Sequence, residues 1–136
     1  MLFFSSISLL VGGLMVVNTM VVSVYERTRE IGISKAIGAS ESDILRMFLA
    51  ECLFIGALGG VLGDFLGVLF STFIDKIGRA LLMSRLDVGN IEHLTALNFE
   101  ILGAGILISL LVSVVSGLYP AWRASKLDPV SALRQL

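Results

Sequence analysis

Three long apolar stretches constrain the fold of this chain more than any other feature. They cover residues 1 to 25, about 47 to 73 and about 101 to 122, and the first and third contain no charged side chain. A helix needs about 20 mostly apolar residues to cross the hydrocarbon core of a bilayer. Each stretch meets that length, so the sequence predicts an all-α integral membrane protein with three transmembrane helices.

The composition supports this prediction. Charged residues make up 15% of the 136 residues and hydrophobic residues 56%, whereas a soluble domain has about 25% charged residues. The formal net charge of -1 gives no reason to expect a nucleic-acid partner. The single cysteine, Cys52, excludes a disulfide within the chain, and we expect a buried thiol. The first stretch lacks the basic start and the cleavage site of a signal peptide.

The distribution of basic residues predicts the orientation. Four Lys or Arg residues lie between the first two stretches and three in the tail, residues 123–136, whereas the three in loop 74–100 are diluted by four acids. Basic residues concentrate on the cytoplasmic side of a membrane. We therefore expect a multi-pass protein of the cytoplasmic (inner) cell membrane, with segment 26–40 and the C-terminus in the cytoplasm. Tyr119 and Trp122 would mark the cytoplasmic interface.

Small residues recur at every fourth position in the second and third stretches. In lipid, such residues let helix backbones approach closely. We expect tight helix–helix contacts at these residues, within the subunit or with a partner. Gly56 and Gly60 form a second row with the same spacing on the adjacent side of the helix. The predicted packing residues are Gly59, Gly63, Gly67, Gly105, Ser109, Ser113 and Gly117.

A few polar residues need separate interpretation. Asp64 lies well inside a span, where a carboxyl group is costly. It is either functional or a structural hydrogen-bonding group that lines the bundle interior or a hydrated cleft. We favour the structural role, because no second acid or base lies at helical spacing. Glu51 is close enough to the cytoplasmic interface to extend its carboxylate to the water or to pair with Arg46. His93 has no further ligand at metal-binding spacing, so no metal site is predicted.

Segment 26–40 has the pattern of a short amphipathic helix. Ile33 and Ile37 are four residues apart, with Ala36 beside them and Ile31 near the same arc, while charged residues supply the polar surface. Gly38 is a natural C-terminal stop. The balanced charge argues against simple adsorption to lipid, so the apolar face predicts a groove on another protein as its partner.

Three local patterns predict where further helices begin in the rest of the chain. Ser40 and Asp43 have the spacing of a capping box that begins the next helix. Apolar residues within loop 74–100 predict a short amphipathic helix there, and Asp128-Pro129 predicts the start of a short cytoplasmic helix. The apolar residues of these two helices are Ile77, Leu81, Leu82 and Leu86 in the loop, and Val130, Leu133 and Leu136 in the tail.

Several motifs together resemble a known family. The run "ERTREIGISKAIGAS", then "DILRMFLAE", "IGALGGVLG" and the terminal "LYPAWRASKLDPVSALRQL" resemble the C-terminal half of FtsX-like (MacB/LolC-type) ABC transporter permeases. The resemblance covers nearly the whole chain apart from the first few residues and the loop. It implies that the short helix is a coupling helix that docks in a groove of a separate ATPase subunit. This role falls on Glu26, Arg27, Thr28, Arg29, Glu30, Ile31, Gly32, Lys35, Ala36, Gly38 and Ala39, with Ile33 and Ile37 of the apolar face.

The resemblance also implies a function. The chain would be a permease subunit or fragment that couples ATP hydrolysis to export, lipoprotein release or other mechanotransmission, as part of a homo- or heterodimer. The chain contains no G-x-x-x-x-G-K-[ST] motif, so ATP and Mg are expected only in the partner ATPase. An enzyme is not expected, because a catalytic site needs polar side chains that converge, and the candidates lie at different depths in the membrane. These candidates are Asp64, Glu51, Cys52 and His93.

Two questions stay open at this stage. An alternative function is an FtsX-type regulatory module that transmits ATPase motion to an extracytoplasmic partner such as a cell-wall hydrolase. Family members usually begin with a further span and a large extracytoplasmic domain, which this sequence does not show. We therefore expect a fragment, a split-gene half or a reduced homologue, and the sequence does not indicate the cargo or the direction of work.

Overall fold

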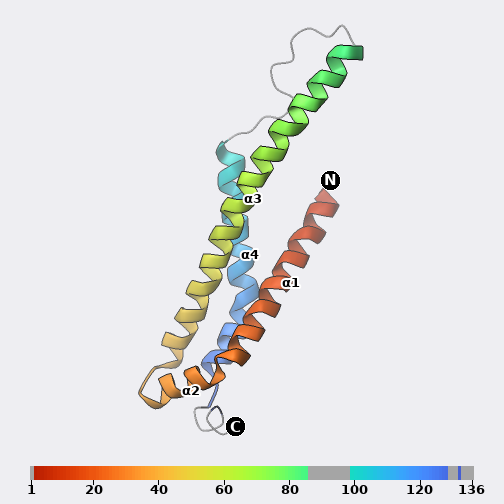
Figure 1. Ribbon diagram of the computed structural model, residues 1–136. Coiled ribbons are helices and arrows are strands. Elements are labelled where there is room, and N and C mark those ends of the chain that lie inside the picture. The colour runs from red at the N-terminus through yellow and green to blue at the C-terminus, as the bar shows by residue number, and fades with distance from the viewer. Residues whose placement is uncertain (1, 86–98, 129–131, 133–136) are drawn as a thin grey trace.

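The computed structural model describes residues 2–85, 99–128 and 132 (Figure 1). Within this part of the chain every regular element is an α-helix: α1 (Leu2–Glu26), α2 (Thr28–Ala36), α3 (Glu41–Arg85) and α4 (Phe99–Ser125). Helices α1, α3 and α4 are long and apolar enough to cross a membrane. The predicted all-α membrane fold with three spanning helices is therefore confirmed.

The three long helices run lengthwise, and α2 lies across one end of the molecule, where it joins α1 to α3 (Figure 1). Helix α4 packs against both α3 and α1, whereas α1 and α3 make few direct contacts with each other. The end of α4 lies at the same end of the molecule as α2. The end of α1, the start of α3 and the end of α4 therefore all lie near α2.

Helix α3 is much longer than a bilayer requires. Its 45 residues correspond to about 68 Å at 1.5 Å per residue, against about 30 Å for the hydrocarbon core. Its far end projects beyond α1 and α4 (Figure 1). The residues from 74 onward were expected to leave the helix, but α3 continues through Ile77 to Arg85. This part contains no proline and several strong helix formers, so nothing ends the helix. Leu86 lies outside the described residues.

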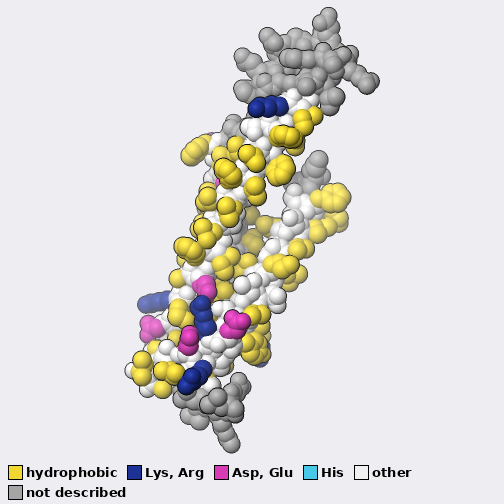
Figure 2. Space-filling model, in the orientation of Figure 1, with side chains coloured by type: hydrophobic (Ala, Val, Ile, Leu, Met, Phe, Trp, Pro, Cys, Tyr) yellow, Lys and Arg dark blue, Asp and Glu magenta, His cyan; other side chains and the backbone are white. Residues whose placement is uncertain are grey.

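Seven fully or almost fully buried side chains form the core at the α2 end. They come from all four helices: Met20 of α1, Ile31 of α2, Ile44, Phe48 and Cys52 of α3, and Ala121 and Ala124 of α4. Away from this core, apolar side chains cover much of the surface (Figure 2), as expected for helices that face lipid. The core fixes α2 relative to the three long helices.

Helix α4 contains Pro120 and ends at Ser125. Most of the short helix expected after it, including Val130, Leu133 and Leu136, lies outside the described residues. The described Ala132 donates its backbone N–H to the carbonyl of Asp128 at 3.0 Å, which is the i to i−4 spacing of a helical turn.

Candidate coupling site around helix α2

The chain enters α2 through a bend at Arg27. This residue has φ −100° and ψ 10°, and its N–H still donates to the carbonyl of Ser23 at 3.1 Å. The Thr28 hydroxyl donates to the carbonyl of Val24 at 2.8 Å. The backbone therefore changes direction while remaining hydrogen-bonded to the last turn of α1.

Helix α2 ends in a Schellman turn. Gly38 has φ +109°, its N–H donates to the Lys35 carbonyl at 3.1 Å, and the Ala39 N–H donates to the Ser34 carbonyl at 2.9 Å. A positive φ of this size favours glycine because a Cβ would be strained. The predicted stop at Gly38 is confirmed.

The capping box at the start of α3 is also confirmed. The Ser40 N–H donates to Oδ2 of Asp43 at 3.0 Å, and the Asp43 N–H donates to Oγ of Ser40 at 3.2 Å. The Ser40 hydroxyl donates to the same carboxylate at 2.6 Å. With caps on both sides, the connection between α2 and α3 is short and defined by hydrogen bonds.

The buried side of α2 is different from the one expected. Ile31 is only 1% exposed and packs into the core with Ile44 and Phe48, and Gly32 is also buried. The sequence interpretation placed Ile31 near the arc of Ile33. Residues two apart on a helix point about 200° apart, so this placement was wrong, and Ile31 attaches α2 to its own chain.

The opposite side of α2 is open. Ile33 is 43% exposed and Ile37 is 84% exposed. Lys, Arg, Asp and Glu side chains gather at this end of the molecule on the face shown in Figure 2. Among the residues assigned to coupling, Glu26, Arg27, Arg29, Glu30, Ile33, Ala36, Ile37 and Gly38 are exposed, Thr28, Lys35 and Ala39 are half-buried, and Ile31 and Gly32 are buried.

Two polar contacts connect this region to α3 and α4. The Lys35 ammonium donates to the backbone carbonyl of Leu127, just after α4, at 2.9 Å. Arg27 pairs with Glu51 of α3 at 3.5 Å, so the suggested partner Arg46 was wrong. Both pair members are partly exposed, and such a pair stabilises by about 1 kcal/mol at most. Sequence reasoning missed both contacts, because they depend on the bend at Arg27.

Small residues of α4 pack closely on α3. The Ser113 hydroxyl donates to the carbonyl of Cys52 at 2.6 Å, and the Ser109 hydroxyl donates to that of Gly56 at 2.9 Å. A Cβ on Gly117 would overlap Sγ of Cys52. Serine-to-carbonyl bonds and missing Cβ atoms are the features that hold helices together in lipid.

On the α3 side, the adjacent stripe makes these contacts. A Cβ on Gly56 or Gly60 would lie 3.1 Å from a Cα atom of α4. A Cβ on Gly59 would meet only a serine hydroxyl at 3.7 Å, and at Gly63 and Gly67 it would meet nothing within 4 Å. Contact of these last two glycines with a partner helix stays a prediction.

Asp64 lies at the contact between α3 and α4. A Cβ on Gly105 would be 2.7 Å from Oδ1 of Asp64, so the glycine makes room for the carboxylate. Oδ2 is enclosed and has no hydrogen-bond partner among the described residues. The sequence suggested a hydrogen-bonding group that lines the bundle interior or a hydrated cleft. The position between α3 and α4 agrees with the first of these, but Oδ2 forms no hydrogen bond with the part of the chain that the structure describes.

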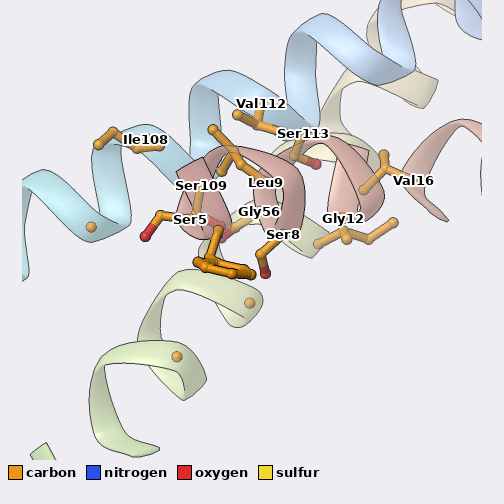
Figure 3. A pocket seen from close by; sticks show the side chains of 15 residues that line it. Ser5, Ser8, Leu9, Gly12, Val16, Gly56, Ile108, Ser109, Val112 and Ser113 are labelled. Carbon is orange, nitrogen blue, oxygen red and sulfur yellow. The ribbon is translucent and has the colours of Figure 1, made fainter. Parts of the chain in front are cut away.

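A groove of about 850 Å³ lies between α1 and α3, and residues of α4 also line it. Figure 3 shows that α1 contributes Ser8 and Gly12, α3 contributes Gly56, and α4 contributes Ser109 and Ser113. The groove explains why α1 and α3 make few direct contacts, while α4 packs against both. Within the described residues, no group of three or more His, Cys, Asp or Glu side chains could hold a metal, and His93 lies outside them.

Comparison with known proteins gives a consistent result. A family model described as FtsX-like permease C-terminal matches residues 2–129. The macrolide export ATP-binding/permease protein MacB of Bdellovibrio bacteriovorus is 47% identical over 131 residues, which cover 96% of this chain and 18% of that protein. An uncharacterized ABC transporter permease of Bacillus subtilis, YknZ, is 41% identical over 130 residues, which cover 96% of this chain and 30% of that protein.

A third relative carries a different export name. The pyoverdine export ATP-binding/permease protein PvdT of Pseudomonas syringae pv. syringae is 41% identical over 129 residues, which cover 95% of this chain and 18% of that protein. The chain therefore spans less than a third of the length of these three relatives.

Proposed function

The chain belongs to the FtsX-like permease family, and on that premise we propose that it is the part of an ABC transporter that receives movement from an ATPase through helix α2. The family match covers residues 2–129, and three helices can cross a membrane. The chain is thus a multi-pass membrane protein of the ABC permease type. The coupling role of α2 is the finer step that we propose.

The observation that carries this proposal is the two-sided environment of α2. Ile31 is buried in the core of the chain, whereas Ile37 is 84% exposed at the other side of a helix that lies across the bundle end. Burying an exposed isoleucine contributes about 1.5–3 kcal/mol. Ile33 and Ile37, bordered by Arg29 and Glu30, therefore form a small apolar face that suits a protein groove with complementary charges.

The ATPase that fits this face is a separate subunit or another part of a longer polypeptide. MacB and PvdT are named ATP-binding/permease proteins, and YknZ is named a permease. ATP and Mg would bind to the ATPase, because this chain contains no phosphate-binding loop motif. The chain itself would contribute no catalytic residue.

The charge distribution supports an orientation with α2 and the C-terminus in the cytoplasm, where ATP is available. A second permease subunit would complete the transporter as a homo- or heterodimer. Gly63 and Gly67 leave open space beside α3, which makes this stripe a suitable contact for another membrane helix.

The contacts of α2 suggest how movement would pass through the molecule. Helix α2 continues from α1 at the bend, is joined to α3 by the capped turn, and is tied to the end of α4 by the bond from Lys35 to Leu127. A displacement of α2 would therefore move one end of each long helix. Helix α3 would carry the displacement farthest, because it extends beyond the other two.

Replacing both isoleucines tests the proposed docking. We expect Ile33→Ser together with Ile37→Ser to reduce recovery of the ATPase in co-purification about tenfold or more, since two apolar contacts are lost. Ile77→Ser is the matched control, because Ile77 is 47% exposed at the other end of α3, and it should leave recovery unchanged. Undiminished recovery with the double variant would show that the ATPase does not bind this face.

A further inference from the structure

A second groove lies between the start of α3 and the end of α4. Its volume is about 420 Å³, and it is lined by Leu45, Val115, Leu118, Tyr119 and Trp122. This volume is within the range of small-molecule sites, about 300–1,000 Å³. The lining is apolar apart from the edges of the two aromatic rings, so the groove suits a hydrocarbon chain.

A cation lies next to one of the residues that line this groove, Trp122. The Lys126 ammonium lies 4.5 Å from the centre of the Trp122 ring. Its contact with the indole face fixes the position of the positive charge while leaving its other donors directed away from the ring. A positive charge at the mouth of an apolar groove complements a phosphate that carries an acyl chain.

The part of α4 that lines the groove, together with Lys126, is about as long as one leaflet of a bilayer is thick. From Val115 to Lys126 the chain advances eleven positions, or about 16 Å at helical rise. Half of the hydrocarbon core is about 15 Å thick. Aromatic residues such as Trp122 and Tyr119 prefer the boundary between hydrocarbon and headgroups, which places Lys126 at headgroup depth.

We propose that this groove binds an anionic phospholipid, with an acyl chain in the groove and the headgroup phosphate on the Lys126 ammonium. Acidic Glu41 lies one helical turn before Leu45 and is exposed, so it opposes the anion from the α3 side. The positive end of the α3 dipole acts in the other direction. Exposed Arg46 and Arg123 follow Leu45 and Trp122 in the chain, but Lys126 is the cation in contact with the Trp122 ring, and we assign the preference for an anionic headgroup to it.

Trp122 is the only tryptophan of the chain, so its fluorescence reports directly on this groove. The purified full chain is placed in vesicles of phosphatidylcholine and phosphatidylglycerol, and only one of the two lipids carries bromine on its acyl chains in each sample. We expect brominated phosphatidylglycerol to quench Trp122 with about fivefold greater apparent affinity, the factor that one basic residue near an anionic surface contributes.

Four variants test whether the lipid preference arises at Lys126 or from the overall charge of the protein. Lys126→Gln should make the two lipids equally effective, Lys126→Arg should keep the preference, and Glu41→Gln should increase it. Lys76→Gln, at the other end of α3, should leave it unchanged. Helix content measured by circular dichroism confirms that each variant is folded.

Equal quenching by both lipids in the unchanged chain, or a preference that survives Lys126→Gln, would overturn the proposal. Inorganic phosphate added to pure phosphatidylcholine vesicles should not alter Trp122 emission, because it offers no acyl chain to the groove. A response as large as that to phosphatidylglycerol would indicate a phosphate site and would also overturn it. None of these outcomes depends on the ATPase.

Discussion

Among the described glycines, Gly117 leaves the least room for a side chain. Cys52 of α3 occupies the space where its Cβ would stand, and the Ser113 hydroxyl, one turn earlier, bonds to the Cys52 carbonyl. The helices are thus held by close backbone approach and by a serine that bonds across the interface. Cys52 is buried in the same core as Met20, and both side chains lie close to Gly117.

We expect Gly117→Ala to destabilise the protein by about 1–3 kcal/mol, the range for an overpacked core. The measurement is the midpoint of thermal unfolding followed by circular dichroism in detergent. Gly103→Ala on the same helix should have little effect, because its Cβ would meet nothing within 4 Å. Replacing Cys52 by alanine in the Gly117→Ala variant should restore part of the lost stability. If the two glycine variants unfold at the same temperature, the close contact is not as described.

The small-residue spacing could be predicted from the sequence, but the contacting face of α3 could not. Gly56 and Gly60 form one stripe, and Gly59, Gly63 and Gly67 form another. Both have the four-residue spacing, so periodicity alone does not distinguish them. The choice depends on the rotation of α3 about its axis, which the core around Phe48 determines.

At the scale of elements, the short connection between α2 and α3 depends on local chemistry. Gly38 ends α2, and the reciprocal bonds of Ser40 and Asp43 begin α3. These signals involve residues within a few positions of one another, so the sequence was sufficient to predict them. They give α2 its direction across the end of the bundle.

Removing the cap should loosen the start of α3. We expect Ser40→Ala to cost about 1 kcal/mol and to accelerate hydrogen exchange of the backbone amides in the first turn of α3. Ser42→Ala is the control, since the Ser42 hydroxyl lies 3.1 Å from the Ser40 hydroxyl and takes no part in the reciprocal bonds between Ser40 and Asp43. Equal acceleration in both variants would contradict the capping role of Ser40.

Other elements could not be predicted from local pattern. The apolar spacing after residue 74 fits a separate interfacial helix as well as an extension of α3, and the structure shows the extension. The bond from Lys35 to Leu127 joins residues 92 positions apart, and the pair of Arg27 and Glu51 requires the bend between α1 and α2. Such contacts arise only after the helices have packed.

At the scale of the whole molecule, the four helices share one core at the α2 end. Beyond it, a groove lies between α1 and α3, while α4 packs against both helices. Because α1 and α3 make few direct contacts beyond this core, a movement of the α2 end can change the width of the groove between them. This property connects the proposed ATPase contact at α2 to the rest of the molecule.

The most direct test of this account is a distance measurement across the groove. Spin labels on Ser8→Cys of α1 and Gly59→Cys of α3, both exposed residues that line the groove, report the separation in the reconstituted complex with its ATPase. We predict that ATP shifts the distance distribution. The shift should disappear when Arg29 and Glu30 are both replaced by alanine, while the subunits remain assembled and ATP is still hydrolysed. An ATP-dependent shift of unchanged size in that double variant would contradict the coupling role of α2.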